Sequence, residues 1–203
     1  MHVANIDFTN FYSEAFDSTS GVSSFVKCVK GLTSTTNKAK IVIHQAGRLV
    51  WLADRIEEYA SGRPALQILF YTIAAEAVAK IVMDYRGESE SKKHVKIFFE
   101  DICSDSSREI LRHAFSTSLS CGFLGLKEAI DYLYKIRCDV AHEGKYFAYA
   151  LREDIPMLTP TSDEFLIAHT TLQELRRIVL EGALLGAMKL LPPDSSCRQL
   201  LNI

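Results

Sequence analysis

One stretch of the sequence, from Ala65 to Met83, constrains the fold more than any other, because it is apolar and has nearly the length of a membrane span. It nevertheless contains Gln67, Glu76 and Lys80, and charged side chains at the centre of a bilayer are costly. The sequence therefore predicts a buried helix of a soluble protein. Because this segment is apolar on most of its circumference, we expect it to lie at the centre of the fold.

Helical periodicity extends over most of the chain. Apolar residues recur near every 3.6 positions, and segments rich in Gly, Pro, Ser or Thr separate the periodic stretches. The predicted helices cover roughly residues 41–60, 64–85, 95–102, 110–115, 126–136 and 170–191, preceded by a short helix near Phe8 and loosely structured chain up to Lys40. We expect an all-α bundle of five to seven helices, with an N-terminal extension over residues 1–40 and a helical domain over 41–203.

The pattern changes after Gly144. Aromatic residues that favour strands cluster there, prolines follow them, and a second short apolar run comes later. These groups are Tyr146, Phe147, Tyr149 and Leu151, then Pro156 and Pro160, then Phe165 to His169. The segment predicts a small β-hairpin after the preceding helix.

The net charge of the chain is too small and of the wrong sign to attract nucleic acid by long-range electrostatics. The 203-residue chain has 23 Lys and Arg against 25 Asp and Glu, which leaves a net charge of −2. Any contact with nucleic acid must therefore come from a local basic surface. The composition, with 48% hydrophobic and 24% charged residues, is that of a folded globular domain.

The cysteines predict reduced thiols. The five residues are odd in number, widely spread and never spaced as CxxC, which argues against a disulfide framework and against a zinc site: Cys28, Cys103, Cys121, Cys138 and Cys197. The N-terminal residues lack a basic segment followed by an apolar run, so they do not indicate a secretory signal. We expect a cytoplasmic protein that does not contact a membrane.

Most motifs of known chemistry are missing from the sequence. It contains no Walker A loop, no GxGxxG, no HExxH and no GxSxG motif. The six histidines lie far apart, and none has another at the i+3 or i+4 spacing that would form a metal site on one helix. We therefore expect a protein that works without a metal or another cofactor.

One segment, from Ile136 to Gly144, concentrates reactive groups. Arg137 and His142 are five residues apart and diverge by roughly 140° on an ideal helix, so they share a site only where the helix distorts or ends. Gly144 can take the left-handed conformation that ends a helix. Asp139 lies three residues before His142, where it can hold the imidazole ring and raise its pKa.

The residue types of this segment suit phosphodiester chemistry without a metal. The guanidinium of Arg137 is a planar donor fork for a phosphate, and the imidazole of His142 can exchange protons near neutral pH. A second interpretation stays open, since Arg, Asp and His near a helix end also form ordinary capping and salt-bridge clusters.

The sequence resembles a known family at these residues. Arg137-x4-His142 after a hydrophobic helix is similar to the Rx4–6H motif of HEPN domains (higher eukaryotes and prokaryotes nucleotide-binding), and YLYKIRCDVAHEGKYF resembles the motif helix of many bacterial HEPN proteins. Glu76, within Ala74-Ala75-Glu76-Ala77, resembles the acidic position of an earlier core helix of that family. The resemblance covers about residues 48–191.

The resemblance implies a helical bundle that forms a homodimer, with the motif residues of the two chains facing each other across the two-fold axis. Many members are metal-independent endoribonucleases of toxin–antitoxin or phage-defence systems, and others are dimerisation, nucleotide-binding or protein-binding modules without activity. Active members commonly have Asn, Asp or His directly after the arginine, whereas this chain has Cys138 there. Both functions are therefore carried forward as hypotheses.

The catalytic hypothesis assigns a role to each residue. RNA cleavage by attack of the ribose 2′-hydroxyl needs a base and an acid, and two subunits supply two copies of His142 for these roles. Arg137 binds the scissile phosphate, and Asp139 or Glu76 orients the two groups. Lys135 and Lys145 are the candidates for holding RNA, and an antitoxin or other protein is a candidate partner.

Overall fold

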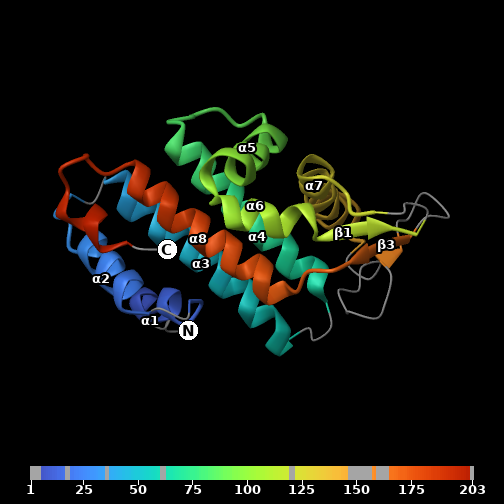
Figure 1. Ribbon diagram of the computed structural model, residues 1–203, viewed down its shortest axis with the longest axis horizontal. Coiled ribbons are helices and arrows are strands. Elements are labelled where there is room, and N and C mark those ends of the chain that lie inside the picture. Colours follow the sequence, from blue (N-terminus) through green and yellow to red (C-terminus); the bar gives the residue numbers. More distant parts are fainter. Residues whose placement is uncertain are drawn as a thin grey trace.

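The computed structural model describes residues 6–16, 19–34, 37–59, 63–118, 122–145, 157–158 and 165–201. In these ranges the α-helices are α1 (Phe8–Ser13), α2 (Thr19–Lys30), α3 (Lys38–Tyr59), α4 (Pro64–Val82), α5 (Ser91–Ile97), α6 (Asp105–Arg112), α7 (Leu126–Glu143) and α8 (Leu172–Lys189). A π-helical turn η1 (Phe98–Ile102), a 3-10 turn η2 (Ser196–Leu200) and three strands, β1 (Phe115–Thr117), β2 (Met157–Leu158) and β3 (Phe165–Ala168), complete the fold (Figure 1). The predicted all-α bundle with a small hairpin is confirmed.

Three of the long helices, α3, α4 and α8, pack against one another and form the centre of the molecule (Figure 1). In the described part of the chain, α4 is the one helix that is long and apolar enough to cross a membrane, yet more than half of its apolar window is buried among the other helices. The sequence prediction of a central core helix is therefore confirmed, and burial of such an apolar helix is consistent with a soluble protein.

The N-terminal segment is more ordered than its sequence indicated. The prediction of loosely structured chain is wrong for α2, which packs on α1 and η2 and buries Phe25, Val26 and Val29 completely. Tyr12 on α1 donates a hydrogen bond of 3.0 Å from its hydroxyl to the carbonyl oxygen of Ile43 on α3. These contacts attach the segment to the core.

A disulfide joins Cys28 of α2 to Cys197 of η2, with the two Cα atoms 5.6 Å apart. The prediction that all cysteines are reduced thiols is therefore wrong for this pair. The spacing of cysteines along the sequence indicates only pairs that are close in the chain. Cys28 and Cys197 are 169 positions apart and meet because α2 packs on η2. Cys103 and Cys138 are free thiols, and Cys121 lies outside the described residues.

The small sheet has the order β1-β3-β2 and is antiparallel. The β2–β3 pair forms a small hairpin as predicted, and β3 matches the predicted run at 165–169. The first strand differs from the prediction, since β2 lies at Met157–Leu158, while the aromatic run at 146–151 lies outside the described residues. The sequence did not predict β1, because three residues are too few to show alternation and Phe115 pairs with the distant Ala168. The helix predicted over 110–115 instead ends at Arg112.

Candidate functional site

Helix α7 positions the residues of the Arg–His segment. The polar side chains of this segment are less buried than the apolar side chains of the same helix. The apolar side chains form a stripe that is buried against the bundle: Ala129, Ile130, Leu133, Ile136 and Val140. Gly144 adopts a φ of 63° and its N–H donates to the carbonyl oxygen of Asp139, so Gly144 caps the helix as predicted. The helix itself extends to Glu143, beyond the predicted span of 126–136.

Arg137 is held by a carboxylate of a different helix. Its Nη2 lies 3.4 Å from Oε2 of Glu76 on α4, and its guanidinium carbon lies 5.5 Å from the centre of the Tyr134 ring. The Arg137 side chain is 18% exposed and that of Glu76 is 10% exposed, so the pair lies at the edge of the core. The structure thus brings together two of the four residues that were predicted to be catalytic.

Glu76 is fixed by two further donors. Nζ of Lys80 lies 2.8 Å from its Oε1, and the Ser91 hydroxyl donates to the same oxygen at 2.7 Å. Burial alone raises the pKa of Glu76, but the hydrogen bonds from Lys80 and Ser91 and the charges of Lys80 and Arg137 outweigh it, and the pKa lies below its ordinary value. Glu76 is therefore an anion that holds the Arg137 side chain in one place.

This anion makes stability depend on pH. Because the pKa of Glu76 in the folded protein lies below its ordinary value of 4.5, the carboxylate stabilises the fold above that pH, and the contribution is lost as the pH falls through the folded-state pKa. We expect Glu76→Gln to lower the free energy of unfolding at pH 7 by about 1–3 kcal/mol. In urea unfolding between pH 7 and pH 3, the variant should also lose less stability on acidification than the wild type.

A matched control for this prediction is Glu100→Gln, because Glu100 has an exposed carboxylate on η1. The control should reproduce the wild-type stability at pH 7 and its dependence on pH. If the two variants gave the same profile, the Glu76 carboxylate would contribute no more than a surface charge.

The structure does not bring His142 to Arg137. Helix α7 remains regular until Glu143, so its end comes after His142 and leaves the two side chains roughly 140° apart. His142 is exposed, and among the described residues it has no hydrogen-bond or ion-pair partner. The expectation that the helix end would place both groups in one site of a single chain is not met, because the helix ends only after His142.

The other predicted polar residues make local ion pairs. Asp139 lies 3.8 Å from Nζ of Lys135, and within the described ranges it makes no hydrogen bond to His142, in contrast to the prediction. Lys145 pairs with Glu143, and this contact raises the pKa of Lys145 and lowers that of Glu143. Both lysines predicted to hold RNA therefore face a carboxylate of the same chain.

The residue after Arg137 contacts an aromatic side chain. Cys138 is half-buried, and burial together with the neighbouring Cys138 thiol raises the pKa of Tyr134. Lys80, Ser91 and Tyr134 were missed by the sequence analysis. Lys80 could have been found, since it lies four residues after Glu76 on one helix face, whereas no local signal connects Ser91 to this site.

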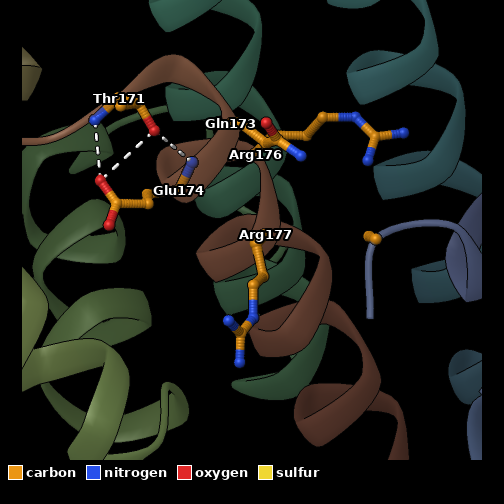
Figure 2. Close-up of a pocket in the computed structure, with 6 residues that line it drawn as sticks. Thr171, Gln173, Glu174, Arg176 and Arg177 are labelled. Carbon is orange, nitrogen blue, oxygen red and sulfur yellow. Dashed lines mark hydrogen bonds between the residues drawn. The ribbon is translucent and has the colours of Figure 1, made fainter. Parts of the chain in front are cut away.

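A second polar region lies at the start of α8, where a cavity of about 280 Å³ is lined mainly by residues of that helix. The Glu174 carboxylate accepts from the backbone N–H and hydroxyl of Thr171 in a capping box. Figure 2 shows Arg176 and Arg177 pointing away from each other. Arg176 donates from Nε to both carboxylate oxygens of Asp54, at 3.1 and 2.9 Å. Thr171, Glu174 and Arg176 thus make contacts within the chain, and the two arginines do not converge on one point.

In comparisons with protein families, characterised proteins and solved structures, the chain has no significant match. Within the residues that the structure describes, no group of three or more His, Cys, Asp or Glu side chains could hold a metal ion.

Proposed function

We propose that this protein is a HEPN-like, metal-independent endoribonuclease that works as a homodimer in a toxin or phage-defence system. The observation that supports the proposal is that the two motif residues of α7 differ in their surroundings. Arg137 is held in place by Glu76, while His142 is exposed and unpaired among the described residues. A phosphate-binding group that is fixed and a proton-transfer group that is accessible are what cleavage of RNA requires.

The proposed reaction uses two copies of His142. One imidazole accepts the proton of the ribose 2′-hydroxyl as this oxygen attacks phosphorus, and the imidazole of the partner chain donates a proton to the leaving 5′-oxygen. Among the described residues Arg137 donates one N–H to Glu76, so further N–H groups at the end of its guanidinium remain for the phosphate. Of the two candidates for the orienting role, Glu76 is the one that contacts Arg137, whereas Asp139 pairs with Lys135. We therefore assign this role to Glu76.

A pair of matched oligonucleotides tests this proposal. The purified protein is incubated in EDTA with a single-stranded RNA and with DNA of the same sequence. We expect cleavage of the RNA only, because DNA lacks the 2′-hydroxyl that attacks phosphorus. Intact RNA, equal cleavage of the DNA, or cleavage that appears only after a divalent metal is added would contradict the proposal.

A second function, a HEPN-like module that binds a nucleotide or protein without catalysis, is favoured by a different observation. The charge of Arg137 is balanced by Glu76, and Lys135 and Lys145 each face a carboxylate. Calorimetry with nucleotides distinguishes the two functions. Binding of a nucleotide by a protein that leaves RNA intact would support the module.

The proposed function places the protein in the cytoplasm, where an RNA substrate and an antitoxin or other protein partner would meet it. The Cys28–Cys197 disulfide is the feature that weighs against this compartment, because cytosolic thiols are kept reduced. Alkylation of free thiols in intact cells, followed by mass spectrometry, reports the state of this pair.

A further inference from the structure

Three aromatic rings lie side by side on the surface beside the small sheet. His113 follows α6, Phe123 lies between β1 and α7, and His169 follows β3. The centre of the Phe123 ring is 5.0 Å from that of His113 and 5.0 Å from that of His169, with interplanar angles of 78° and 82°. We refer to these three residues as the aromatic cluster.

The aromatic cluster is anchored by hydrogen bonds. Phe123 forms a backbone bridge with Ser116 of β1, and the Ser116 hydroxyl lies 2.7 Å from Nε2 of His169. Nδ1 of His113 lies 3.0 Å from the carbonyl oxygen of Glu109. The rings therefore lose little freedom when a ligand binds, which favours affinity.

The cluster is also accessible. Phe123 is 53% exposed, the His113 side chain is 54% exposed, and His169 is exposed as well. A single exposed phenylalanine is common on protein surfaces. The unusual feature here is that two exposed imidazole rings lie against it in edge-to-face contacts, so that three partly exposed aromatic rings are gathered at one place.

The surroundings of the cluster favour a flat ligand over a protein partner. The other large hydrophobic residues exposed in the described ranges lie on α3, at the end of α4 and on η2: Leu52, Tyr59, Met83 and Leu200. None of these four residues lies on the segments that carry the aromatic cluster, and a stable protein interface needs about 800 Å² from each partner. Exposed aromatic rings are the typical platform on which bases of single-stranded RNA stack.

We infer that the aromatic cluster of His113, Phe123 and His169 is a stacking site for a nucleobase of single-stranded RNA. This inference rests on the proposed function and adds a binding subsite to it. The cluster lies at the start of α7 and Arg137 lies eleven residues into that helix, about 16 Å along its axis at 1.5 Å per residue. A base bound there would belong to the substrate strand some nucleotides away from the cleaved bond.

The test measures binding of a short single-stranded RNA that contains 2-aminopurine, a fluorescent base that is quenched when it stacks. We expect Phe123→Ala and Phe123→Leu to raise Kd about 5-fold to 150-fold and to remove the quenching, because both lose the ring. Phe123→Tyr retains an aromatic ring and should keep the wild-type Kd and the quenching. Met83→Ala removes another exposed apolar side chain, outside the cluster, and should bind like the wild type.

Several outcomes would overturn the inference, and they differ from a failure of the proposed function. Wild-type affinity in Phe123→Leu would show an apolar contact in place of stacking, and unchanged affinity in Phe123→Ala would show no contact at all. A change of oligomeric state in Phe123→Ala, measured by analytical ultracentrifugation, would assign the cluster to a protein interface. A wild-type protein that binds no RNA would overturn the inference together with the proposed function.

Discussion

Replacing His142 by Ala should lower the rate of RNA cleavage in EDTA about 100-fold to 10,000-fold, the usual contribution of a general acid or base. The effect is this large because each imidazole supplies one of the two proton transfers, and the variant loses both in a homodimer. His142 is exposed and has no partner among the described residues, so stability should change by no more than about 0.5 kcal/mol. Single-turnover cleavage and urea unfolding measure the two quantities.

Lys127→Ala is the matched control for this prediction, because Lys127 is exposed at the opposite end of the same helix. It should cleave RNA within a few-fold of the wild-type rate. If His142→Ala cleaved RNA as fast as the wild type, the cleavage would come from another group or from a contaminating nuclease, and the histidine mechanism would be excluded.

Replacing Cys28 by Ser should lower the free energy of unfolding by about 2–5 kcal/mol. The disulfide closes a loop of 169 residues, and a long closed loop restricts the unfolded chain strongly. The loss also leaves α2 and η2 attached to each other by packing alone. Urea unfolding of the variant and of the wild type, each with and without a reducing agent, measures the effect.

The reducing agent provides an internal control. It should bring the wild type to the stability of Cys28→Ser and leave the variant unchanged. Cys138→Ser, which removes a free thiol, should keep the wild-type response to reduction. A wild type that is equally stable in both conditions would show that the Cys28–Cys197 pair contributes nothing to stability.

The candidate site was only partly predictable. Glu76 stood out as a charged residue in an apolar helix and by its resemblance to an acidic position of the HEPN family. The structure pairs it with Lys80 on the same helix and with Arg137, 61 residues away. The contact of Asp139 with His142 was predicted from their spacing alone, and the competing ion pair with Lys135 is formed instead. Spacing on a helix shows which contacts are reachable, but it does not rank the partners that compete for one carboxylate.

By itself, the sequence determined the helical class, the central position of α4 and the end of α7 at Gly144. Hydrophobic periodicity and capping chemistry act over a few neighbouring residues, so a linear pattern contains them. Only the tertiary structure decided that Glu76 holds Arg137, that Cys28 meets Cys197 and that β1 pairs with β3. Each of these contacts joins distant segments, and it forms where the packing of whole helices places them within reach.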